Sequence, residues 1–187
     1  MSLRVGMVAL VGRLRRLVDD GTAGIWENDE LQDILDTHKY RVHRESLERE
    51  KTLLSDTAYE YRIFHSRWGN LEAGGSATFK LEDSAGTQKG TATYSADYLR
   101  GVVTMTTDQA GTMIYLTGWT YDLNAAAGDC WRERASKVTS YYDVQLDGHN
   151  LSRSQWFKHC ADMADMYDSR ARARTVRVWR DSLTEDD

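Results

Sequence analysis

The chain has 187 residues, with 24 Lys and Arg against 29 Asp and Glu, a formal net charge of −5 and no proline. An acidic balance argues against a general nucleic-acid-binding domain, because such domains carry a basic face. The absence of proline excludes polyproline recognition segments and stiff proline spacers, so turns must be made by Gly, Asp, Asn or Ser. A hydrophobic fraction of 41% is typical of a packed globular chain.

Membrane and secretion signals are missing from the sequence. No stretch reaches the roughly 18 apolar residues that a membrane-spanning helix requires. Arginines interrupt residues 1–17, which also lack the cleavage site of a signal peptide. Cys130 and Cys160 are too few for a disulfide scaffold and lack zinc-site spacing. We therefore expect a reducing cytoplasm, no membrane partner and two buried thiols.

Two helices are predicted at the N-terminus. Apolar residues recur at helical spacing over residues 3–18, and an Asp-Asp-Gly turn ends the pattern. A second helix is predicted over residues 29–42, with Asn28 as its N-cap and two acids in its first turn. Trp26 is placed to fold over that turn as a hydrophobic staple.

From about residue 50 to residue 120 the apolar period changes from helical to alternating. The predicted strands lie within residues 58–64, 77–81, 101–106 and 113–117. Gly- and Asp-rich turns separate them, at residues 74–75, 83–86 and 108–111. The pattern predicts an antiparallel β module of four or five strands.

The helical period returns after Trp119. Helices are predicted over residues 121–143 and 152–173, with Ser152 and Gln155 as a capping box, and they form an antiparallel hairpin. In this hairpin Cys130 and Cys160 are placed at comparable heights and are predicted to face each other. Trp119, Trp131 and Trp156 are predicted core residues.

These patterns predict an α+β fold. Its frame is a helical bundle, made of two N-terminal helices and the long C-terminal helical hairpin, with a small antiparallel β module inserted between them. The expected division is residues 1–45 for the helical pair, 46–118 for the β module, 119–173 for the hairpin and 174–187 for a C-terminal docking tail.

Candidate catalytic groups do not combine into a recognisable motif. His159, Asp162 and Asp165 follow an i, i+3, i+6 spacing that drifts off one helix face. His38 and His43 are five residues apart, whereas a zinc pair on a helix needs three or four. GxSxG and the glycine-rich phosphate loops are absent. We expect no enzymatic activity, no metal and no cofactor; a small metal-dependent hydrolase is a distant third hypothesis.

The C-terminal segment is the best candidate for docking on another chain. Trp179 alternates with arginines, and Trp and Arg are enriched at binding hot spots. The predicted interface residues are Arg170, Arg172, Arg174, Val176, Arg177, Val178, Trp179 and Arg180, together with Trp68 in a turn-like stretch. A frayed tail, or a tail folded back on its own helices, would have the same sequence. The arginines would also complement a helix dipole or passing DNA.

Several segments occur in an order that is informative as a set. They are Leu14 to Asp20, Ile25 to Asp36, Leu116 to Ala127, Asp147-Gly148, and Ser152 to Gln155. The first two contain a helix end, a short loop and an Asn-Asp-Glu helix start; the third precedes an aromatic-rich helix. In this order the segments resemble the head–tail connector (adaptor) proteins of tailed bacteriophages. The resemblance covers about residues 10–36 and 114–170.

The resemblance implies a structural virion protein, a helical protomer that assembles, commonly as a twelve-fold ring, beneath the portal. Such a ring extends the DNA channel and links the capsid to the tail. The implied partners are further copies of the chain, the portal protein, a tail or stopper (neck) protein, and genomic DNA through non-specific contacts. The implied location is the neck of the virion, and the host cytoplasm during assembly. The β module, larger than the family's usual loop, is expected to project towards tail or neck partners.

A DNA-binding regulatory protein is the main alternative, with the first two helices as a helix-turn-helix. The loop from Asp19 to Trp26 is longer than the three or four residues usual in that motif. The second helix would also bring Glu30, Asp33 and Asp36 towards phosphates, which is electrostatically poor.

Overall fold

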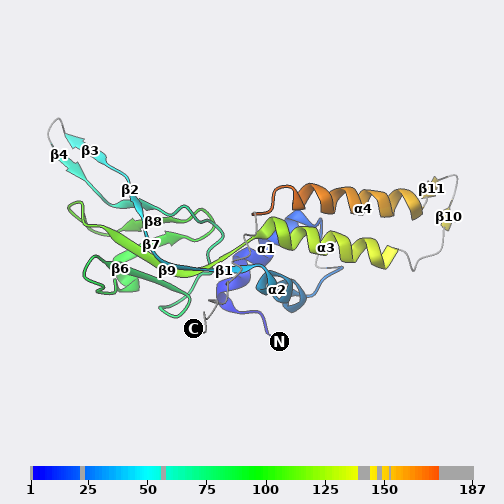
Figure 1. Ribbon diagram of the computed structural model, residues 1–187, viewed down its shortest axis with the longest axis horizontal. Helices are drawn as coiled ribbons and strands as arrows, with labels where there is room; N and C mark the ends of the chain where they lie inside the picture. The colour runs from blue at the N-terminus through cyan, green and yellow to red at the C-terminus, as the bar shows by residue number, and fades with distance from the viewer. Residues whose placement is uncertain are drawn as a thin grey trace, which may run out of the picture.

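The computed structural model describes residues 2–21, 24–55, 58–138, 144–146, 149–151 and 153–172. Within them the chain is a mixed α+β protein with antiparallel sheets. The helices gather at one end of an elongated molecule and most of the strands at the other (Figure 1).

The helical end is built around one hydrophobic core. Its elements are the 3-10 turn η1 (Val5–Met7) and the helices α1 (Val8–Leu17), α2 (Asn28–Thr37), α3 (Leu123–Val138) and α4 (Arg153–Asp168). Helix α3 packs against all three other helices. The core includes Leu10, Leu14, Leu35 and Trp131, and Trp26 is buried in it as well.

Helices α3 and α4 run antiparallel. The side-chain amide of Asn124, at the start of α3, donates a hydrogen bond to the carbonyl of Arg170 just beyond α4 (3.1 Å). Both Cys130 and Cys160 are buried in the shared core. At the other end of the pair lies a two-stranded sheet of β10 (Val144–Leu146) and β11 (His149–Leu151) (Figure 1). Ser152, the predicted cap, lies outside the described residues.

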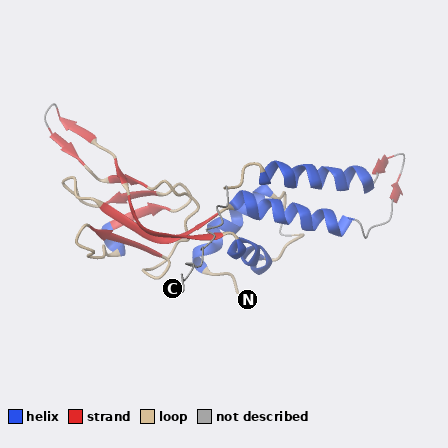
Figure 2. Ribbon diagram, in the orientation of Figure 1, coloured by secondary structure: helices blue, strands red, loops and turns tan. Residues whose placement is uncertain are grey.

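Two antiparallel sheets and a separate hairpin make up the β end (Figure 2). The first sheet has the order β1 (Lys39–Ser46), β9 (Ile114–Tyr121), β6 (Phe79–Asp83). The second has the order β2 (Glu48–Arg49), β5 (Ile63–His65), β8 (Val102–Met105), β7 (Tyr94–Asp97), with the 3-10 turn η2 (Thr91–Thr93) before β7. The separate hairpin is β3 (Thr52–Ser55) with β4 (Ala58–Glu60). Phe64, Phe79, Leu81, Val103 and Leu116 come from both sheets and share one core.

Strands β1 and β9 join the two ends of the molecule. Helix α2 leads into β1 and β9 leads into α3, and the two strands pair from Lys39 with Tyr121 onwards. Tyr121 is fully buried in the helical core, whereas Leu116 of the same strand is buried in the β core. One strand pair therefore contributes to both cores.

The prediction of a helix over residues 29–42 is wrong beyond Thr37, because residues 39–46 form β1. In this stretch charged residues alternate with Tyr40 and Val42, a period of two that suits a strand paired with β9. The cap also differs from the prediction. Glu27 is the N-cap residue, and its backbone N–H donates to Glu30 Oε2 (2.7 Å).

The predicted core position of Trp156 is wrong, because this side chain is 37% exposed. It lies in the first turn of α4, where the helix pair extends beyond α1 and α2 (Figure 1). Trp131 is buried as predicted, and Trp119 is only partly buried. The predicted count of four or five strands from about residue 50 to residue 120 is also too low, since the described residues there form seven strands, β3 to β9.

Candidate protein-binding interface

Three of the predicted interface residues lie in the described part of the chain: Trp68, Arg170 and Arg172. The predictions for Arg174, Val176, Arg177, Val178, Trp179 and Arg180 lie outside the described residues. Trp68 is partly buried and Arg170 is exposed. Only these three positions can therefore be compared with the predicted interface.

The structure brings Arg172 and Trp68 together. The guanidinium carbon of Arg172 lies 4.6 Å from the centre of the Trp68 ring, and the backbone N–H of Arg172 donates to Asp122 Oδ2 (2.6 Å). The other carboxylate oxygen of Asp122 accepts the backbone N–H groups of Asn124 (3.0 Å) and Ala125 (3.1 Å) at the start of α3. Asp122 therefore caps one helix and holds the chain that leaves the other.

Arg172 is therefore held where the helical and β ends meet. A cation over an indole ring is typical of protein interfaces, although here both groups belong to one chain. Arg170 takes no part in this contact; its backbone carbonyl accepts the Asn124 amide instead. The structure thus brings two of the predicted interface residues, Trp68 and Arg172, into contact and leaves Arg170 at the surface.

An exposed aromatic pair at the helical end was missed by the sequence analysis. Trp156 and its neighbour Phe157 are 37% and 44% exposed. The Arg134 guanidinium carbon lies 4.9 Å from the Trp131 ring and 5.0 Å from the Trp156 ring, while His159 stacks on Trp156 with ring centres 5.5 Å apart. Adjacent aromatic residues on a helix point about 100° apart, so the Trp-Phe dipeptide was a usable signal that at least one is uncovered.

The β3–β4 hairpin forms a second exposed apolar surface, at the opposite end of the molecule (Figure 1). Leu53 and Tyr59 are direct cross-strand partners, and their exposed fractions are 59% and 46%. The Lys51 ammonium lies 3.5 Å from the centre of the Tyr59 ring. Two-stranded hairpins are marginally stable in water on their own, so an exposed apolar pair here is suited to contact with a partner.

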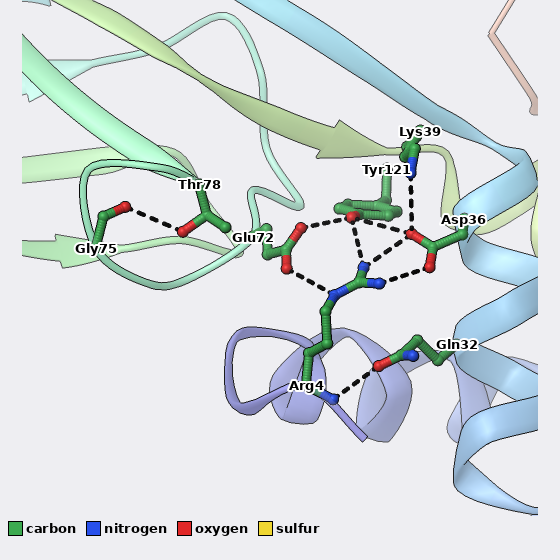
Figure 3. A network of polar contacts seen from close by, with 8 residues as sticks. All are labelled: Arg4, Gln32, Asp36, Lys39, Glu72, Gly75, Thr78 and Tyr121. Atoms are coloured by element: carbon green, nitrogen blue, oxygen red, sulfur yellow. Dashed lines mark hydrogen bonds and ion pairs between the residues drawn. The ribbon is translucent and has the colours of Figure 1, made fainter. Parts of the chain in front are cut away.

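A polar network joins the helical end to the β end (Figure 3). Arg4 forms a bidentate ion pair with Asp36 of α2 (2.7 and 2.8 Å) and also donates to Glu72 Oε1 in the loop before β6 (3.1 Å). The Tyr121 hydroxyl, at the end of β9, donates to Glu72 Oε2 (2.6 Å). Burial and the Glu72 carboxylate raise the pKa of Tyr121, and the Arg4 guanidinium lowers the pKa of Asp36.

The backbones of the two ends also touch directly beside this network. The backbone N–H of Ala73 donates to the carbonyl of Gly6 (3.3 Å). A Cβ added at Gly6 would lie 1.9 Å from the Ala73 carbonyl oxygen, so a side chain at this position is incompatible with the contact. The junction is therefore held by a close backbone approach as well as by charge-assisted hydrogen bonds.

The histidines singled out in the sequence have structural neighbours. His159 stacks on Trp156 and meets the Trp131 ring edge-on, and His38 Nε2 lies 2.5 Å from Asp129 Oδ2. Within the described residues, no group of three or more His, Cys, Asp or Glu side chains could hold a metal ion. Burial raises the pKa of the Cys130 thiol to about 12, which keeps it protonated and unreactive.

Comparisons with known proteins give no family for this chain: no family model, no curated protein and no solved structure matches it. Among the described helices, none has the length and apolarity that crossing a membrane requires.

Proposed function

We propose that the protein is a structural connector, a head–tail adaptor of a tailed bacteriophage that joins the portal to the tail. One observation carries the proposal: two exposed aromatic surfaces lie at opposite ends of an elongated molecule whose halves are held by a polar junction. The first is Trp156 with Phe157 on α4, and the second is Leu53 with Tyr59 on the β3–β4 hairpin. A protein that links two partners requires such an arrangement.

In this proposal the helices are the bundle frame of the adaptor and the β end is the inserted module. Neighbouring copies pack into a ring, commonly twelve-fold in the resembled family, and the ring extends the DNA channel. The helical surface contacts the portal, while the hairpin reaches a tail or stopper protein. Each aromatic surface includes a nearby cation, Arg134 or Lys51, as is typical of interface hot spots.

The junction supports this role through stiffness. A connector transmits force between its partners only if its two ends keep a fixed relation, and Arg4 links both ends through Asp36 and Glu72. The C-terminal segment, which begins beside Trp68, is proposed to dock on a neighbouring copy or on the portal. Its arginines could also meet genomic DNA without sequence specificity. The proposed location is the virion neck.

The two other hypotheses are weaker proposals. A helix-turn-helix regulator would place the exposed acids Glu30 and Asp33 of α2 near phosphates. A metal-dependent hydrolase would need His38 and His159 as ligands, but these residues contact Asp129 and two tryptophans.

A binding experiment with two pairs of substitutions tests the proposal. The full-length chain and the portal protein of the same virus are mixed and binding is measured by biolayer interferometry. We expect the pair Trp156→Ser and Phe157→Ser to weaken portal binding at least tenfold, whereas Leu53→Ser and Tyr59→Ser leave it unchanged and weaken binding to the tail-side protein. Equal binding by all three proteins, or no binding by the wild type, would contradict the proposal.

A further inference from the structure

The outer side of the β1–β9–β6 sheet carries cations and a concavity that the proposed connector role does not use. The concavity has a volume of about 500 Å³ and is lined by Arg41, His43, Arg44, Ser76, Lys80 and Thr117, with Glu82 at one side. Glu82 forms an ion pair with Lys80 (2.6 Å). The cations that remain come from β1, in a protein whose net charge is −5.

Aromatic rings hold the arginines of β1 in position. The Arg41 guanidinium carbon lies 5.0 Å from the centre of the Trp119 ring, and the Lys39 ammonium lies 5.4 Å from the same ring. The Arg44 guanidinium carbon lies 5.1 Å from the centre of the Tyr115 ring. Such contacts favour one position of each cation before a ligand arrives, which lowers the entropic cost of binding.

A bulge in β1 places Arg44 at the concavity. Val42 pairs with Gly118 and Glu45 with Leu116, so two residues of β1 stand opposite Thr117 alone. Arg44 has a φ of 48°, a left-handed conformation that costs a non-glycine residue of the order of 1 kcal/mol. Its backbone N–H donates to Thr117 Oγ1 (3.0 Å), so this hydroxyl accepts one hydrogen bond and can also donate one to a ligand. Strained bulges are frequent beside binding sites.

The two arginines retain unused hydrogen-bonding capacity. Among the described residues, no carboxylate forms an ion pair with Arg41 or Arg44, whereas Arg4, Arg15 and Arg67 each pair with an acid. Arg44 uses one N–H group on the carbonyl of Ser84 (3.1 Å). Guanidinium forks with free N–H groups beside a hydroxyl form the donor set that phosphate oxygens prefer.

We propose that this concavity binds the phosphodiester backbone of double-stranded DNA, with Arg41 and Arg44 as the principal phosphate contacts. Arg41 and Arg44 lie three residues apart on β1, on either side of His43, so they present a row of two charges along the strand rather than a single pocket. A row suits a polymer of phosphates better than a free anion. The site is separate from the C-terminal arginines that the proposed function assigns to genomic DNA, and its DNA binding can be measured without portal or ring assembly.

Fluorescence anisotropy with a labelled duplex of 30 base pairs tests this site in the full-length protein. We expect Arg41→Gln with Arg44→Gln to weaken binding about tenfold or more at low salt. The slope of log K against log salt should fall by about 1.8, since each lost phosphate contact removes about 0.9. The control is Arg100→Gln, which removes an exposed cation from the turn that follows β7. It should leave the affinity for the duplex and the salt slope unchanged.

Three outcomes would overturn the proposal. The first is no DNA binding by the wild type at low salt, and the second is an equal loss in the Arg100→Gln control. The third is displacement of the labelled duplex by another anion as effectively as by unlabelled duplex, at equal charge concentration. Displacement by inorganic phosphate would show a simple anion pocket. Displacement by poly-glutamate would show a surface for an acidic protein. Circular dichroism of the glutamine double variant shows whether its fold is intact. The variant Arg41→Lys with Arg44→Lys keeps both charges and should retain most of the DNA binding.

Discussion

At the scale of single residues, the structure depends on polar groups whose roles are set by distant partners. Arg15 is buried and pairs with Asp20 (2.5 Å), which in turn accepts the backbone N–H of Trp26. Arg4 and Asp36 pair across two segments in the same way. Periodicity shows only which face of a helix is apolar, so it predicted Leu10 and Leu14 as core but not these pairs. Partners far apart in sequence could not be identified from spacing.

The Arg4–Asp36 pair predicts a specific dependence of stability on pH. Arg4 lowers the pKa of Asp36 in the folded protein. The ion pair therefore contributes fully to the free energy of unfolding above about pH 4, which is the usual aspartate pKa in unfolded chains. This contribution is lost as the pH falls through the lowered pKa of the folded state. At pH 7 we expect Asp36→Asn to reduce the free energy of unfolding by about 1–3 kcal/mol. Urea unfolding should show this difference shrinking below pH 4.

Asp33→Asn is the matched control, because it removes an exposed acid from the same helix. Its effect on unfolding should be within about 0.5 kcal/mol at every pH. A difference between Asp36→Asn and wild type that persists unchanged to pH 2 would show that the ion pair is not its source.

Buried thiols give a second prediction at this scale. Burial raises the pKa of Cys130 to about 12 and also raises the pKa of Cys160. The thiolate fraction of Cys130 at neutral pH is then roughly 10³-fold below that of an ordinary cysteine with a pKa near 8.5. We expect almost no reaction with a disulfide reagent in the native protein and two thiols per chain after unfolding. Rapid native labelling would show that the α3–α4 core is open.

At the scale of elements, the sequence predicted the helices better than the strands. Helical spacing located α1, α3 and α4, and the turns containing Gly86 and Gly111 have the positive φ values that glycine permits. Strand β1 was taken for a helix end because its short alternation follows directly on α2. Trp156 was misplaced because a periodic stripe marks the side of a helix but not how far a neighbouring helix extends along it.

The two helical tryptophans should therefore differ in their contribution to stability. Trp131 is buried and its indole N–H donates to the Leu17 carbonyl (3.2 Å), so Trp131→Ala should cost about 3–5 kcal/mol. Trp156 is partly exposed, and Trp156→Ala should cost about 1 kcal/mol. Chemical denaturation of both variants measures the two values. Equal costs would contradict the exposed position of Trp156.

At the scale of the whole molecule, the α+β class was predictable from the change of period near residue 50 and its return after Trp119. The joint between the two ends was not, because it depends on the buried Tyr121 hydroxyl, the Glu72 carboxylate and the close approach of Gly6 to Ala73. Each of these meets its partner only in the folded chain. The interface prediction was limited for the same reason: Trp68 and Arg172 were each singled out, but their contact comes from the tertiary fold.

We propose that this chain is an assembling connector with a partner at each end of the molecule. Mass photometry of the purified full-length protein, alone and mixed with the portal of the same virus, tests it most directly. We expect a complex whose added mass is an integral multiple of the 21.4 kDa chain and corresponds to a closed ring on the portal. A mixture in which the portal keeps its own mass and the chain remains a 21.4 kDa monomer would contradict it.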